Sequence, residues 1–415
     1  MNAGIDQDTG ATLAEASGMS LANSGDDRRP GLAIISNVAA PYRIALHQRI
    51  AKEIPEFRLH TIFTHNVWDF DWKMEFPPEI NVVNFHDGRT HASDVWQRGF
   101  WKSFVKGGEI AGYLKRHNVR AVILNGYSDA ARLRLLRFCR RNGIAMFIRS
   151  DSNLKGDRRK SPLRIFLKRR LVGWVLKQCD GFMPMGRDGR DYYEAYGGER
   201  SRCFFVPAEP NLTAFESVDP DALAAFQARQ NIDPARNYIL FSGRLIQLKR
   251  IDTLIDAFAQ VAERIPSWDL LIVGDGDKRA EWERRTPEAL RHRVHWTGFL
   301  DISELTLAYH TSKILTLPSD REAWALVLPE AMAAGLPVIS SDQVGAAREM
   351  IEDGKNGRIF AAGDVAQLAE AIADVTDPAK YAAYRAAVPV VFGRFREASD
   401  PVMGVRKALA FVGLI

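Results

Sequence analysis

Cysteine is scarce in this chain of 415 residues, and long apolar runs are absent. The three cysteines, Cys139, Cys179 and Cys203, are few and widely spaced, which suits neither a disulfide framework nor a zinc site. No run of 18 or more apolar residues occurs, which argues against a membrane-spanning helix. Residues 1–30 lack the basic and apolar regions of a secretion signal, and we expect a disordered tail there. These features favour a cytoplasmic protein.

The net charge is modest but unevenly placed. A formal charge of +5 does not suit nucleic acid as the main partner. Residues 155–170, however, hold eight cations and one acid. Ser161 and Pro162 begin a predicted helix, whose apolar stripe comprises Leu163, Phe166, Leu167, Leu171, Trp174 and Val175. Two interpretations stay open, since the stripe can pack in the domain core or lie on an anionic membrane surface.

Short apolar runs alternate with amphipathic stretches in two blocks, which predicts two doubly wound parallel sheets. The first block has predicted strands at 32–36, 59–64, 121–124, 145–148 and 181–185. The second has them at 238–242, 270–273, 294–296, 314–317 and 338–340. The chain is also longer than one core usually needs, so the sequence predicts an α/β protein of two Rossmann-like domains.

Two stretches of the second block carry the chemistry. In residues 321–340, Glu322 and Glu330 stand on either side of an expected helix start near Leu326, and Gly335 is suited to end that helix. Free backbone N–H groups at such a helix start favour anions. In residues 241–252, a strand is followed by Gly243, Arg244 and Lys249. These cations are suited to a diphosphate.

With these motifs, and with residues 272–276 and 294–299 in matching order, the sequence resembles the retaining glycosyltransferases of family 4, which have the GT-B fold. The resemblance covers nearly all of residues 31–415. It implies an acceptor-binding domain at 31–215, a linker region at 216–236 and a nucleotide-sugar-binding domain at 237–392. It also implies a cleft between the domains and a C-terminal helix at 393–415 that crosses back to the first domain.

The resemblance assigns roles to residues of the second domain. Arg244 and Lys249 would stabilise the leaving diphosphate without a metal ion, and Glu322 would hold hydroxyls of the donor sugar. Glu330 would bind the ribose hydroxyls. The remaining expected donor-binding residues are Gly243, Gly274, Phe299, Ala323, Trp324, Leu326 and Val327. Ala323 and Ala325 stand where relatives often have glycine, and a buried, packing Phe299 is the alternative to a base contact.

In the first domain, loops after predicted strands offer acceptor-side residues. They are Asn37, Tyr42, Arg43, Asn125, Arg149 and Asp151. Arg43 is suited to the acceptor or the diphosphate, or to a plain helix start, and Asp151 to the acceptor or a turn cap. Many family members have a His that points at the donor sugar, where this chain offers Arg149.

The implied activity is transfer of a hexose-type sugar from a nucleoside diphosphate sugar to a glycan or a lipid-linked acceptor. The setting would be bacterial surface polysaccharide assembly at the inner face of the cytoplasmic membrane. No cofactor is expected.

Three alternatives remain. One is a sugar-nucleotide epimerase or a phosphorylase of the same fold, and another is a catalytically silent relative that binds glycans or serves as a scaffold. The third is a metal-dependent transferase that uses Asp69 and Asp71, beside Trp68 and Trp72 as candidates for sugar stacking.

Overall fold

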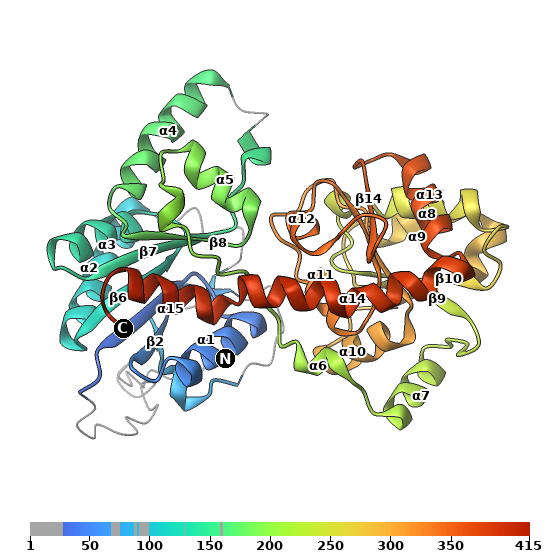
Figure 1. Ribbon diagram of the computed structural model, residues 1–415, viewed down its shortest axis with the longest axis horizontal. Coiled ribbons are helices and arrows are strands. Elements are labelled where there is room, and N and C mark those ends of the chain that lie inside the picture. Colours follow the sequence, from blue (N-terminus) through green and yellow to red (C-terminus); the bar gives the residue numbers. More distant parts are fainter. Residues whose placement is uncertain (1–27, 68–74, 87–88, 91–98, 128, 158–160) are drawn as a thin grey trace, which may run out of the picture.

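The computed structural model describes residues 28–67, 75–86, 89–90, 99–127, 129–157 and 161–415. Most of the predicted N-terminal tail lies outside these residues, as do Trp68, Asp69, Asp71 and Trp72. The described chain forms two α/β domains that lie side by side (Figure 1).

The first domain is built on a six-stranded parallel sheet in the order β4-β2-β1-β6-β7-β8. Its strands are β1 (Gly31–Ser36), β2 (Arg58–Phe63), β4 (Val82–Asn84), β6 (Val119–Asn125), β7 (Ala145–Ser150) and β8 (Gly181–Pro184). Two short strands, β3 (Asn66–Val67) and β5 (Arg89–Thr90), pair separately. Leu32 and Ala33 of β1 are fully buried in clusters on opposite faces of the sheet, as expected for a strand covered on both faces.

Helices cover both faces of this sheet (Figure 1). One face packs against α2 (Phe100–Arg116), α3 (Ala130–Arg141), α4 (Pro162–Leu176) and α5 (Arg187–Ala195). The other packs against α1 (Pro41–Glu53) and the C-terminal helix α15 (Pro401–Phe411), which supplies Val402 and Val405 to that core.

The second domain repeats the architecture, with the strand order β11-β10-β9-β12-β13-β14. Its strands are β9 (Asn237–Ser242), β10 (Trp268–Val273), β11 (Val294–Gly298), β12 (Ile314–Leu317), β13 (Val338–Ser341) and β14 (Gly357–Phe360). Its helices are α8 (Ile251–Val261), α9 (Arg279–Arg285), α10 (Ile302–Thr311), α11 (Val327–Ala333), α12 (Ala347–Met350) and α13 (Val365–Val375). The prediction of two doubly wound parallel sheets is therefore confirmed, and the arrangement is the GT-B fold.

Two passages of the chain and a group of polar contacts join the domains. The chain passes through α6 (Thr213–Glu216) and α7 (Pro220–Arg229), and it returns along α14 (Pro378–Ser399) into α15 (Figure 1). Arg348 Nη1 of the second domain also lies 2.7 Å from Asp188 Oδ1 of the first. Arg187 Nε lies 3.2 Å from Glu349 Oε1. Polar contacts thus hold one side of the interdomain gap together.

Helix α4 begins at Ser161 and Pro162 as predicted, but its apolar stripe is not a core stripe along its whole length. Val172 and Val175 are fully buried. Leu163, Phe166 and Leu167 are 66%, 57% and 58% exposed. Packing of the entire stripe in the core, one of the two interpretations, is wrong because the first half of the helix projects beyond the sheet it would have covered. None of the helices in the described ranges has the length and apolar character to cross a bilayer.

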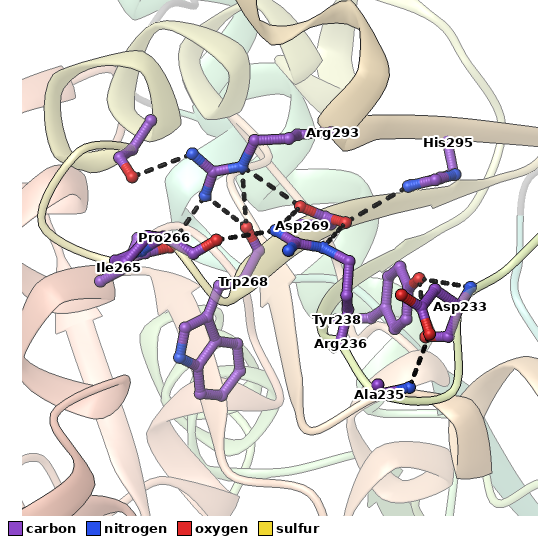
Figure 2. Close-up of polar contacts among 11 residues, drawn as sticks. Asp233, Ala235, Arg236, Tyr238, Ile265, Pro266, Trp268, Asp269, Arg293 and His295 are labelled. Atoms are coloured by element: carbon purple, nitrogen blue, oxygen red, sulfur yellow. Dashed lines mark hydrogen bonds and ion pairs between the residues drawn. The ribbon is translucent and has the colours of Figure 1, made fainter.

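An ion-pair network lies at the amino ends of β10 and β11 in the second domain. Figure 2 shows its contacts. Asp269, near the start of β10, is 1% exposed and is contacted by Arg236, Arg293 and His295. Burial would raise the pKa of Asp269, but hydrogen bonds from His295 and Arg236 outweigh it and lower the pKa to about 2. Because ligands of parallel sheets bind beyond the carboxyl ends of the strands, this network is structural.

Candidate active site

The ends of β9 and β10 approach so closely that their loops require glycine. Gly243 and Gly274 have φ angles of 149° and 129°, which side-chain-bearing residues rarely adopt. A Cβ atom on Gly274 would lie 1.9 Å from the carbonyl oxygen of Gly243. One on Gly276 would lie 2.4 Å from that of Leu245. Gly243 and Gly274, both predicted from the sequence, therefore allow the loops to adopt this conformation, and a ligand can approach their backbone closely.

Lys249 and Glu322 form an ion pair beside this loop. A 3-10 turn over Gln247–Lys249 brings the ammonium to Glu322 Oε1, and Ser319 Oγ donates a hydrogen bond of 3.1 Å to the same oxygen. A Cβ atom on Gly243 would lie 3.6 Å from Lys249 Nζ, so the ammonium borders the glycine loop. Both side chains are partly exposed. A cation and a carboxylate therefore lie next to each other beside the glycine loop that follows β9.

Arg244 extends into solvent from the same loop. The structure gives its guanidinium no hydrogen bond or ion pair with the described residues, whereas Arg250 nearby is paired with Asp252 and Asp320. Arg244 therefore keeps its donors available for a ligand.

Glu330 is buried, unlike an ordinary acid on a helix surface. It lies in α11 at 8% exposure, and Tyr309 of α10 donates a 2.7 Å hydrogen bond to its Oε2 atom. Burial raises the pKa of Glu330 to about 7, although the Tyr309 bond opposes the rise. Sequence reasoning missed Tyr309, because an aromatic residue in an amphipathic helix gives no distinct signal.

The turn that leads into α11 is strained at Ala325, whose φ angle is 88°. The helix starts at Val327, with Leu326 as its N-cap residue, close to the predicted start. The sequence analysis did not single out Gly345. Its lack of a side chain lets the carbonyl of Ala323 pack against it, since a Cβ atom on Gly345 would lie 2.2 Å from that oxygen. At Ala325 the backbone of this turn therefore has a positive φ angle, which glycine adopts at a lower cost in free energy.

Trp324 and Phe299 have opposite environments. Trp324 is 6% exposed, and its Nε1 atom donates a 2.8 Å hydrogen bond to the carbonyl of Ala208 in the interdomain connection. This side chain anchors the connection. Phe299 follows β11 and is 65% exposed, so the alternative of a packing phenylalanine is wrong. Its ring is open to a planar ligand.

On the first domain, Asn37 and Asn125 belong to one polar network. Asn125 Nδ2 donates a 2.6 Å hydrogen bond to Ser36 Oγ, and Asn37 accepts one from the guanidinium of Arg132. Arg132 is 1% exposed and also pairs with Asp129. Sequence reasoning missed Arg132, because one arginine in an arginine-rich helix does not stand out.

Arg149 and Arg43 lie near the start of α1. Arg149 is 6% exposed, its Nε atom donates to the carbonyl of Val206, and its Nη2 atom is buried without a partner among the described residues. Arg43 Nη1 donates to the carbonyl of Val38, and its guanidinium lies 5.4 Å from the ring centre of Tyr42. Arg43 is therefore more than a surface residue at a helix start.

The two domains share a small pocket. Ser150, Asp151 and Ser152 line it from the first domain, and Ala323, Trp324 and Gly345 line it from the second. The acceptor-side loop after β7 and the donor-side turn before α11 therefore face each other. Among the described residues, no group of three or more His, Cys, Asp or Glu side chains could hold a metal ion. Metal independence stays a prediction, since Asp69 and Asp71 are outside those residues.

Comparison with known proteins finds similarity in the second domain. Residues 224–386 match the model of the family described as Glycosyl transferases group 1. This match agrees with the predicted resemblance to glycosyltransferases of GT-B fold.

Curated relatives match about half of the chain or less. D-inositol 3-phosphate glycosyltransferase of Nocardia farcinica is 29% identical over 45% of this chain and 42% of its own length. Glycogen synthase of Mycobacterium tuberculosis is 33% identical over 51% of this chain and 49% of its own length. An exopolysaccharide phosphotransferase of Streptomyces coelicolor is 34% identical over 40% of this chain and 17% of its own length. This chain thus spans less than half the length of these relatives.

Solved structures match over almost the whole chain. HepE of Anabaena, in complex with UDP and glucose, aligns with a TM-score of 0.68 at 15% identity and covers 93% of this chain and 100% of its own. A glycosyltransferase of Rickettsia africae aligns with a TM-score of 0.71 at 14% identity and covers 93% of this chain and 98% of its own. At these identities, the likeness concerns the fold.

Proposed function

We propose that this protein is a retaining glycosyltransferase, which moves a hexose-type sugar from a nucleoside diphosphate sugar to a glycan or lipid-linked acceptor without a metal ion. The observation that carries the proposal is the Lys249 and Glu322 pair beside the glycine loop of β9, within the region that matches the group 1 family. Solved complexes of HepE with UDP-glucose support a nucleotide-sugar donor.

In this proposal, the donor diphosphate lies against Gly243 and is neutralised by Arg244 and Lys249. Negative charge grows on the β-phosphate as the anomeric C–O bond breaks, so cations already in place lower the barrier. Arg244 would bind two phosphate oxygens as a fork, and Lys249 would act as a compact charge. Donor binding would then compete with the existing pair between Lys249 and Glu322, freeing the carboxylate for the sugar hydroxyls.

Glu330 would accept hydrogen bonds from the ribose hydroxyls, and Phe299 would lie near the base. The backbone of Leu326 and Val327 would line the turn next to the phosphates. No Asp or Glu is assigned as a nucleophile. Retention would instead follow from a same-face reaction, in which the departing phosphate oxygen accepts the proton of the acceptor hydroxyl.

The same proposal places the protein in surface polysaccharide biosynthesis, at the inner face of the cytoplasmic membrane. The exposed first half of α4 supports contact with an anionic surface: Leu163, Phe166 and Leu167 project into solvent, and α4 contains four cations and no acid. Phe100 and Trp101 at the start of α2 are also exposed, at 62% and 73%. Apolar side chains among cations are typical of interfacial helices.

A transfer assay tests the proposal. The protein is incubated in EDTA with UDP-, GDP- and ADP-sugars, with and without a mixture of lipid-linked and soluble glycans, and NMR follows the anomeric centre of any product. We expect turnover with one nucleotide and an unchanged anomeric configuration. Conversion of the donor without an acceptor into an epimer would identify the epimerase, and no reaction with any donor would favour the silent relative. Loss of activity in EDTA would contradict metal independence.

A further inference from the structure

Two arginines of the first domain carry charge that the described chain does not neutralise. Arg149, at the end of β7, is more than nine-tenths buried, yet its Nη2 atom has no hydrogen-bond partner in the part of the chain that the structure describes. The Nε atom of Arg43 is likewise buried without a partner. A buried guanidinium N–H without an acceptor costs free energy, so a missing acceptor is the simplest explanation for both atoms.

The other groups around these arginines do not supply that acceptor. Arg132, the third arginine nearby, is satisfied by Asp129, Asn37 and the carbonyl of Asn125. Asp151 is the carboxylate that acts on Arg149, but it is exposed and makes no hydrogen bond with the described residues. Its partial charge compensation leaves Arg149 Nη2 without an acceptor among the described residues.

The pKa of His47 reflects the positive charge of the two arginines. It is 2% exposed, and its Nδ1 atom lies 3.0 Å from Thr61 Oγ1. Burial, and then the charges of Arg149 and Arg43, lower the pKa of His47 to about 3. The imidazole is therefore neutral at physiological pH and adds no further positive charge beside the two arginines.

The two guanidinium groups lie beside the start of α1. This helix of 13 residues follows β1, its N-cap residue Ala40 makes no side-chain capping bond, and its first turn holds no acid. Arg43 is itself in that first turn, and Arg149 is close enough for its charge to affect both Arg43 and Tyr42. Pro41 has no N–H, and the N–H groups of Arg43 and Ile44 donate to the carbonyl of Ala40, so this turn adds at most one backbone donor to the two guanidinium groups.

We propose that Arg43 and Arg149, beside the start of α1, form an oxyanion site, and that it binds a phosphoryl group of the acceptor substrate. The inference rests on the proposed function and specifies the acceptor as a phosphate- or diphosphate-bearing molecule. Arg244 and Lys249 already provide two cations for the donor on the opposite domain, so a second pair on the acceptor domain fits a separate anion. This site would hold the acceptor by its phosphoryl end while its hydroxyl faces the donor.

Calorimetric titration tests the site in the full chain. The donor site is first saturated with the nucleoside diphosphate that binds best, and inorganic pyrophosphate is then titrated into the wild-type protein, Arg43→Gln and Arg149→Lys. We expect saturable binding by the wild type, at least about tenfold weaker binding by both variants, and nucleotide affinity unchanged within about twofold. Arg200→Gln removes an exposed arginine of the same domain, 68% exposed, and should bind as the wild type does.

The variants and the titrated ligands distinguish an acceptor site from a donor site and from no site. Equal pyrophosphate binding by the wild type and Arg43→Gln would overturn the site, and the partial exposure of Arg43 makes this variant safe for folding. Loss of nucleoside diphosphate but not nucleoside monophosphate binding in the variants would assign the anion to the donor instead. Geranyl diphosphate, titrated in parallel, distinguishes a lipid-linked acceptor, which predicts tighter binding than pyrophosphate, from a soluble phosphorylated acceptor, which predicts equal binding. Failure of the proposed function would show separately, as no nucleotide binding by the wild type.

Discussion

The ammonium of Lys249 is bonded to the carboxylate of Glu322, and both groups border the glycine loop after β9. The pair holds two oppositely charged groups in place before any substrate arrives. Such preorganisation is what stabilisation of a leaving diphosphate requires, since the cation does not have to move far when charge develops.

Removal of either donor-side cation should lower turnover. We expect Arg244→Ala and Lys249→Ala to reduce kcat by roughly two orders of magnitude or more, because negative charge on the β-phosphate loses a fixed cation. Steady-state kinetics with the active donor measures the effect. Arg284→Ala, which removes an exposed arginine of α9, is the control and should keep full activity. Wild-type turnover in both active-site variants would refute the assigned roles.

Nucleotide binding should depend on pH through Glu330. Burial raises its pKa from the usual 4.5 to about 7, so the folded protein binds a proton there between these values. The carboxylate accepts hydrogen bonds from ribose better than the acid does, and we expect affinity for the nucleoside diphosphate to rise from pH 6 to 8. Calorimetry across this range checks it. Glu330→Gln should bind more weakly and without this slope, and a parallel slope in the variant would exclude Glu330 as its source.

The same group makes stability fall as the pH rises. The unfolded chain releases the proton near pH 4.5 and the folded chain near pH 7, so the free energy of unfolding should fall between these values by up to about 3 kcal/mol. Denaturant unfolding of wild type and Glu330→Gln at pH 5 and 8 measures the difference. A gap between the two proteins that does not change with pH would contradict the raised pKa.

Strain at Ala325 predicts a stabilising substitution. Its φ angle of 88° is costly for alanine and free for glycine, so Ala325→Gly should raise the free energy of unfolding by about 1 kcal/mol. Ala323→Gly, two positions earlier in the same turn but without a positive φ, should give no gain. Thermal unfolding of both variants measures the change in stability. A Tm for Ala325→Gly below that of the wild type would mean that the turn is not strained at Ala325.

The exposed part of α4 predicts membrane association. Phe166→Ser with Leu167→Ser should reduce co-flotation with vesicles that contain phosphatidylglycerol, because these apolar groups would no longer enter the interface. High salt should also release the wild-type protein. Val390→Ser, at an exposed apolar position of α14, is the matched control. Equal flotation by the wild type and the α4 variant would reject this surface.

The strands were predictable because buried parallel strands are short apolar runs, as at β9, where the prediction was one residue shorter than Asn237–Ser242. The donor-side residues were predictable because glycine and charge have specific uses at strand ends, as at Gly243. The exposure of Phe166 was not predictable, because an apolar stripe in the sequence of a helix does not show whether another element covers that face. The unpartnered Arg149 also required the structure, because pairing is decided between segments far apart in the chain.

The central claim, that a nucleoside diphosphate binds beside the Lys249 and Glu322 pair, is tested most directly by the dissociation constants of UDP, GDP and ADP for the wild type and Lys249→Ala. The account predicts that one of the three binds the wild type clearly best, and that Lys249→Ala binds it at least about tenfold more weakly while the corresponding monophosphate is hardly affected. Equal diphosphate affinity in the two proteins, or no binding of any nucleotide to the wild type, would contradict it.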